Sequence, residues 1–305
     1  MKKYFALILL VIFLLPQIAQ AAISFVGSAA NSASPTTDTV VTLPGSMAAD
    51  DLIIVAAAVG DTTSNGLAAP TQGGYARVPG VAATLYANDV NDTNLDLYYK
   101  FHNGTDTDVT FADVGGSNAS NVAVVMVFRG VDTSTPFDTN ANTATGVSTS
   151  AADPPSHDWS GTAGVWTVIA ASTGHTGGAT ATFTFPANYT TNARQDAHND
   201  TIDLLAGMGY RTSPADPENP AAFTAATIGT AADNGWAAVT MSLKEQSTVA
   251  PSVTTVSSVA SVTSATITGD ITATGGATPT ERGFAWGTSP TLLNGGAATT
   301  TEIGS

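Results

Sequence analysis

The chain has 305 residues and is acidic, with 9 Lys and Arg against 24 Asp and Glu and a formal net charge of −15. Nucleic acids and anionic membrane surfaces are bound by basic patches, which a chain so poor in Lys and Arg cannot form, so both partner classes are excluded. The chain contains no cysteine, which excludes disulfides, thiol nucleophiles and zinc–thiolate sites.

The first 21 residues have the pattern of a secretory signal peptide. A Lys-Lys start precedes an apolar run over residues 5–15, and Ala19 and Ala21 form an A-x-A cleavage signal. The run is shorter than the roughly 20 residues that a membrane span needs, although an uncleaved anchor is the alternative. We therefore expect a bacterial protein, secreted or at the cell surface, without membrane insertion after cleavage of residues 1–21.

Alternation of apolar and polar residues predicts β-strands through most of residues 22–246. Residues 95–102 show it most clearly, with Leu95 and Leu97 on one face and Asp96 and Tyr98 on the other. Strands are expected at residues 23–30, 38–43, 75–86, 95–102, 108–111, 182–185, 189–198, 202–211 and 236–243.

Three further runs, at residues 52–59, 122–128 and 165–171, are apolar on both faces. They indicate central strands that are covered on both sides, or strands whose outer face lies under a long loop. Helix is the alternative for residues 52–59, but their β-branched residues and short length favour a strand. The predicted fold class is all-β, a two-sheet jelly-roll or β-sandwich over residues 22–246.

The pattern of residues changes near Gln246. Residues 247–252 are typical of a linker, and a second β-rich pattern occupies residues 253–305. A sandwich domain of the immunoglobulin or fibronectin kind needs roughly 90–100 residues, so this module is predicted to be incomplete, with further β-domains in a longer protein. A complete two- or three-stranded tail is the alternative, although it would leave sheet edges uncovered.

The second module resembles the fibronectin type III-like repeats of bacterial surface proteins, in residues 263–267, the Gly275-Gly276 turn and residues 281–290. The larger domain resembles the concanavalin A-like lectin and glucanase sandwiches of secreted and phage-associated proteins. Residues 49–55, 97–100 and 127–132 carry that resemblance. It implies an extracellular module of the kind that attaches to carbohydrate or to surfaces, and it transfers no catalytic residue.

Motifs for catalysis are absent. The glucanases of this fold use a Glu-x-Asp-x-x-Glu motif, which does not occur, and Glu218 is the one glutamate well inside the larger domain. No Gly-x-Ser-x-Gly or His-Glu-x-x-His pattern occurs either. We therefore expect a protein that is not an enzyme, with a polysaccharide hydrolase that uses aspartates as an alternative.

Residues 88–96 contain the closest match to a metal site. Carboxylates and amides are the hard oxygen ligands that calcium prefers, and here they are closely spaced. The residues predicted to bind calcium, the only cofactor expected, are Asp89, Asn91, Asp92 and Asn94. A well-solvated acidic turn is the alternative.

Trp159, with Asp158 and His157, is the predicted ligand site. The three residues follow a Pro-Pro pair, in a loop just before a strand. An exposed indole can stack on a sugar ring while the neighbouring polar groups bind its hydroxyls. The alternative is that Trp159 is a lid over one end of the sandwich.

These features together predict a non-catalytic extracellular binding or adhesion module whose partner is a glycan or a cell-surface polymer. The main alternative is a structural spacer or decoration module in a surface or virion array.

Overall fold

The structure is a computed structural model. It describes residues 22–33, 37–60, 68–83, 85–87, 92–112, 120–147, 151–160, 164–175, 181–197, 203–226, 234–246, 252–260, 265–273, 283–286 and 299–302. The chain divides into two compact units, of which the larger is Ala22–Gln246 and the smaller contains Ser247–Ser305.

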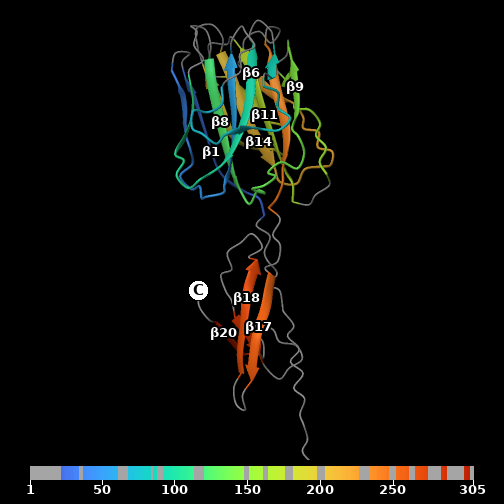
Figure 1. Ribbon diagram of the computed structural model, residues 1–305. Helices are drawn as coiled ribbons and strands as arrows, with labels where there is room; N and C mark the ends of the chain where they lie inside the picture. The colour runs from blue at the N-terminus through green and yellow to red at the C-terminus, as the bar shows by residue number, and fades with distance from the viewer. Residues whose placement is uncertain are drawn as a thin grey trace, which may run out of the picture. The chain divides into compact units, whose positions relative to one another are not determined.

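Two antiparallel main sheets form the centre of the larger unit (Figure 1). The first has the strand order β1-β8-β3-β6-β4, with β5 also paired to β6, and the second has the order β13-β14-β11-β16-β9. The described residues contain no helix, so the prediction of an all-β fold is confirmed, including strands at residues 52–59 and 122–128. The strands of the first sheet are β1 (Ser24–Ala33), β3 (Leu52–Gly60), β4 (Ala76–Arg77), β5 (Leu85–Ala87), β6 (Thr93–Phe101) and β8 (Ser120–Arg129). Those of the second are β9 (Asn142–Gly146), β11 (Trp166–His175), β13 (Thr190–Ala197), β14 (Asp203–Arg211) and β16 (Trp236–Leu243).

Each main sheet carries a smaller sheet on its outer face. The pair β2 (Thr39–Thr42) and β7 (Asp108–Phe111) covers the first sheet, and β10 (Ala151–Ala152), β15 (Phe223–Ala226) and β12 (Thr182–Thr184) cover the second. Along β3, Leu52 and Ile54 join the core between the main sheets, while Ile53 and Val55 join the core under the outer pair. The two-sided covering explains why β3 and β8 are apolar at nearly every position.

The sequence prediction for β6 was right for one face of the strand and wrong for the other. Its inner face, with Leu95 and Leu97, was predicted correctly. Its polar face is buried too, with Asp96 1% and Tyr98 3% exposed. Arg77 pairs with Asp96 through Nη1 and donates from Nη2 to the Tyr98 hydroxyl at 3.0 Å, so these polar atoms have partners without reaching water.

Two further differences concern strand boundaries. Residues 75–86 form two short strands, β4 and β5, because the chain turns between them at Gly80, whose φ is +90°. The short strands β9, β10 and β15 were not predicted, since they are rich in Thr and Ala and β9 has no alternation of large apolar residues.

The two ends of the sandwich are built differently, and we call them proximal and distal. The chain enters and leaves at the proximal end, where Ser24 pairs with Arg129 and the Gln246 N–H donates to the Gly130 carbonyl at 2.8 Å. Four stacked or edge-on rings bridge the main sheets there. They are Phe25, Phe128, Trp166 and Tyr210, with ring centroids 5.1–6.2 Å apart.

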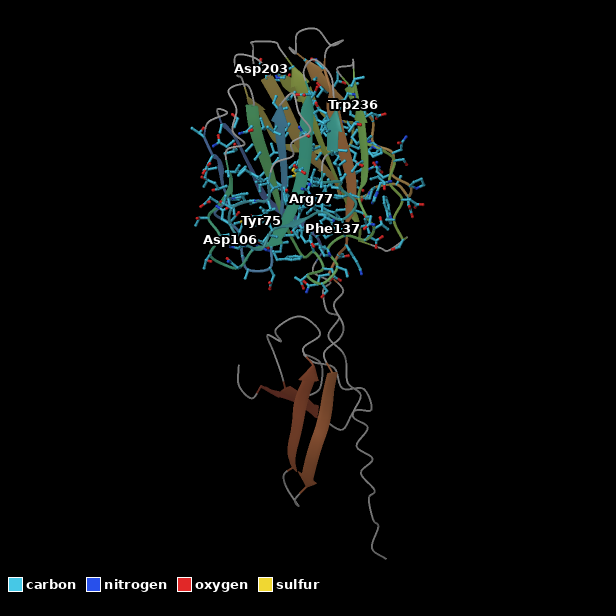
Figure 2. The ribbon with its side chains drawn as sticks, turned by 45° about the horizontal axis from the view of Figure 1, so that its top comes forward. Tyr75, Arg77, Asp106, Phe137, Asp203 and Trp236 are labelled. Carbon is cyan, nitrogen blue, oxygen red and sulfur yellow. The ribbon has the colours of Figure 1, made fainter. Side chains whose placement is uncertain are left out.

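The distal end is polar. In the first sheet Gly60 pairs with Ser120, and in the second His175 pairs with Asp203. The Thr93 hydroxyl donates to the Ser172 hydroxyl at 2.9 Å across the buried space between the sheets. Figure 2 shows Asp203 and Trp236 at this end and Tyr75, Arg77, Asp106 and Phe137 toward the other.

The smaller unit contains two antiparallel hairpins among its described residues. One pairs β17 (Ser252–Ala260) with β18 (Ala265–Ala273), and the other pairs β19 (Gly283–Trp286) with β20 (Thr299–Glu302). A search of the described residues for a helix with the length and apolar character of a membrane span found none.

The outer layers should contribute to stability as a true core does. Phe111 on β7 is 1% exposed, so Phe111→Ala should lower the free energy of unfolding by about 3–5 kcal/mol. Val40→Ala on the paired strand should change it by less than about 0.5 kcal/mol, because Val40 is 41% exposed. Denaturant titrations of both variants measure this. A loss below about 1 kcal/mol for Phe111→Ala would show that the layer is peripheral.

Candidate functional site

Two loops that are far apart in sequence meet at the proximal end, on the outer face of the second sheet. The backbones of His157 and Glu218 form an isolated antiparallel bridge, with both N–H···O distances 2.8 Å. The bridge brings the predicted ligand residues next to the loop of Glu218. Spacing in the sequence carries no signal for this contact.

Glu218 lies at the centre of the cluster and is 1% exposed. Its carboxylate accepts from Arg211 Nη1 at 2.8 and 3.0 Å, from the Tyr189 hydroxyl at 2.9 Å and from the Ala215 N–H at 2.8 Å. Burial, reinforced by the Glu218 carboxylate, raises the pKa of Tyr189, so its hydroxyl stays protonated and donates. A carboxylate with this many donors acts as a structural anchor, since no lone pair is directed at solvent.

His157 is held on the same face and is 1% exposed. Its Nε2 lies 3.0 Å from Ser242 Oγ and 3.1 Å from Thr139 Oγ1, whereas Nδ1 is buried with no hydrogen-bond partner. Burial lowers the pKa of the ring, although the charges of Asp138 and Asp158 oppose that effect. The ring is therefore a neutral, internal group.

Trp159 is 8% exposed, which leaves its indole little surface for stacking on a sugar. That burial fits the alternative of a lid over the end of the sandwich. Asp158 differs, because it is exposed. The ligand-binding role of His157, Asp158 and Trp159 stays a prediction.

Three aspartates gather on the surface beside the buried cluster. Desolvation raises the pKa of Asp216, and so do a hydrogen bond with the Asp158 carboxyl and the charges of Asp158 and Asp138. A hydrogen bond from the Trp159 N–H acts in the opposite direction and lowers it. Asp138 accepts from the N–H and the hydroxyl of Ser160 at 2.7 and 2.9 Å. An acid whose pKa is raised, beside a second carboxyl group, is the combination that general acid–base chemistry uses, and Asp216 and Asp158 provide it on the surface.

Of the residues predicted to bind calcium, Asp89 and Asn91 lie outside the described residues. Asp92 and Asn94 are each 1% exposed, and Asp92 Oδ2 accepts from the Tyr86 hydroxyl at 2.8 Å. Within the described part of the chain, no group of three or more His, Asp or Glu residues is placed to hold a metal ion. Calcium binding stays a prediction.

The distal end is a second candidate region, of which sequence reasoning singled out only the predicted calcium residues at the start of β6. His175 is fully buried, and its Nδ1 lies 3.8 Å from Asp203 Oδ2. Asn121, 1% exposed, has a side-chain amide without a hydrogen-bond partner. In the sequence, the distal strand ends are joined through residues 61–67, 88–91, 113–119, 176–180, 198–202 and 227–233, which together contain five Asp and no Lys or Arg. Among the described residues, this end carries the hydroxyl groups of Thr93 and Ser172, the amide of Asn121 and the carboxylate of Asp203.

Comparison of the chain with models of protein families, with curated proteins and with solved structures found no match. The resemblances to concanavalin A-like sandwiches and to fibronectin type III-like repeats therefore remain predictions.

The buried neutral His157 should make stability depend on pH. In the unfolded chain this ring takes up a proton near pH 6.5, whereas in the folded chain its pKa is lower. The free energy of unfolding is therefore highest above about pH 6.5 and falls as the pH drops below that value. The stability advantage of the wild type over His157→Gln should shrink on acidification, by at most about 1.4 kcal/mol per pH unit. Denaturant titrations at several pH values measure it. A pH-independent difference would show that the ring does not titrate differently on folding.

Proposed function

We propose that the larger unit is a non-catalytic extracellular binding domain that presents its distal end to a glycan or another cell-surface polymer. The proposal is supported by one observation above all, which is that the chain enters and leaves the domain at the same end. Ser24 and Gln246 both bond to the segment 129–130 at the proximal end. The opposite end is therefore free of chain connections to the rest of the protein.

This arrangement argues against an in-line spacer. A spacer adds length to a string of domains when its termini lie at opposite ends. With its N-terminal strand and its exit toward residue 247 both at the proximal end, the domain has its distal end free for recognition. The signal peptide pattern and the second β-rich module are consistent with such display outside the cell.

The surface chemistry favours polar recognition. Every Phe, Tyr and Trp of residues 22–246 belongs to the described part, and each is buried or half-buried, so none presents a fully open ring for sugar stacking. Hydrogen bonds from hydroxyl, amide and carboxylate groups would then carry recognition, which suits a polyhydroxylated polymer or one with cationic groups. Val40 and Val147, 41% and 49% exposed, are the large apolar side chains that the described residues expose, and both lie toward the distal end.

The proximal cluster supports a role without catalysis. Glu218 has donors on both oxygens, and His157 and Trp159 are buried. A general base or acid must reach a substrate, and neither His157 nor Glu218 has the exposure for it. These groups hold two loops together instead.

Binding is tested with the full chain on a panel of polysaccharides and bacterial cell-wall fractions. We expect retention on at least one fraction, weakened at least about tenfold by Val40→Lys/Val147→Lys, because a tenfold loss needs only about 1.4 kcal/mol. The control Thr133→Lys/Thr212→Lys adds the same two charges at exposed proximal positions and should bind as the wild type does. No retention on any fraction, or an equal loss in the control, would contradict the proposal.

A polysaccharide hydrolase is the second candidate, and the exposed Asp158–Asp216 pair is the observation that favours it. For this function, turnover on a polysaccharide panel should be abolished by Asp216→Asn, which removes one carboxyl group of the pair, and kept by Asp153→Asn, an exposed control on the preceding loop. Reducing-sugar release measures it. We expect no release from the wild type, as a binding domain requires.

A further inference from the structure

A separate constellation lies on the outer face of the first sheet, where the segment at residues 71–72 runs along β7. The Thr71 N–H donates to the Thr110 carbonyl at 2.8 Å. The side chain of Gln72 then meets Thr110 and Asp108, two residues of β7 that share a face. All three side chains are partly buried.

The contacts surround one carboxamide. Gln72 Oε1 accepts from the Thr110 N–H at 2.8 Å, and Gln72 Nε2 lies 2.9 Å from Thr110 Oγ1. Nε2 is the donor to Thr110 Oγ1, and because Nε2 is bonded to Cδ, Oγ1 lies no farther from that carbon than about 4.2 Å, the 2.9 Å contact plus a C–N bond of about 1.3 Å. The Thr110 N–H polarises the carbonyl of the same carbon. Asp108 Oδ1 accepts from Nε2 at 2.5 Å and from the Thr110 hydroxyl at 3.1 Å.

These positions match the parts of an acyl transfer. Thr110 Oγ1 is the nucleophile, Asp108 Oδ1 is the base within reach of its proton, and the Thr110 N–H is a donor for the oxygen that gains negative charge. The same Asp108 oxygen contacts Nε2, so it can pass the proton to the departing nitrogen. Holding all the groups in contact replaces a bimolecular encounter with an internal step.

We propose that Gln72 and Thr110 form an internal ester bond. Thr110 Oγ1 attacks Gln72 Cδ and gives its proton to Asp108, the C–Nε2 bond breaks, and the nitrogen takes up that proton and leaves as ammonia. The C–O bond replaces the C–N bond, and no oxidant, reductant or other reactant is needed. The step occurs once per chain.

The neighbouring charges suit this assignment. The other carboxylate nearby, Asp106, is paired with Lys100 at 2.7 Å, and Figure 2 shows Asp106 beside Tyr75. The Tyr75 hydroxyl is buried without a hydrogen-bond partner, and burial, together with the charges of Asp106 and Asp108, raises its pKa. Asp108 is thus the carboxylate directed at Gln72.

The bond would give a cysteine-free exported protein a covalent tie. It would join the segment that leads into β4 to the outer layer that covers β3 and β8, and so close a loop of the unfolded chain. Cross-links of this kind stabilise chiefly by restricting the unfolded state. The inference is independent of what the distal end binds.

Mass spectrometry of the full exported chain tests the proposal. The measured mass of the intact protein should be smaller than the mass calculated from its sequence by the mass of one ammonia. Trypsin cleaves after Arg77, Lys100 and Arg129, so the peptide of Gln72 and the peptide of residues 101–129 should be recovered joined. Hydroxylamine, which cleaves esters, should separate them.

Variants assign the atoms. Thr110→Val keeps the backbone N–H and should abolish the joined peptide, whereas Thr110→Ser should retain it and Asp108→Asn should slow its formation. Thr71→Val, which removes a neighbouring hydroxyl 3.3 Å from the Thr110 carbonyl, is the control and should remain cross-linked. Separate peptides and an unmodified mass in the wild type would overturn the proposal, and so would an ammonia loss that persists in Thr110→Val.

Discussion

Burial on both faces of the two main sheets is the constraint on which this structure depends. The chain has no cysteine, so the domain must be held by packing and by internal polar contacts. Strands such as β3 and β8 would expose an apolar face if the sandwich had only two layers. The outer strands β2 and β7, and the sheet β10-β15-β12, supply the missing cover.

The same constraint accounts for how charge is placed. Where the outer layers cover a main sheet, acidic side chains are paired with arginine, as Asp96 is with Arg77 and Glu218 with Arg211. Such pairs do not make a fold stable by themselves, but a lone buried carboxylate there would be costly. Among the described residues at the distal end, Asp203 lies instead beside a buried histidine, with its Oδ2 3.8 Å from His175 Nδ1.

The sequence predicts what is local and misses what is distant. Alternation is a property of neighbouring residues, so the strand β6 and its inner residues Leu95 and Leu97 were predictable. The burial of Asp96 was not, since its partner Arg77 lies on another strand, β4. His157 and Glu218 likewise come together from two loops that are 61 positions apart in the sequence. Gln72 and Thr110 are 38 positions apart and also meet only in the folded chain. A pattern of neighbouring residues cannot predict contacts between residues so far apart in the sequence.

The closeness of the chain's entry and exit has an evolutionary consequence. A unit whose two connections leave side by side can be spliced into a surface turn of an unrelated host without stretching the host's backbone, because the insertion point need not open. Recombination could therefore move this domain between proteins as a unit, at internal positions as readily as at termini. In-line modules, whose connections lie at opposite ends, lack that freedom.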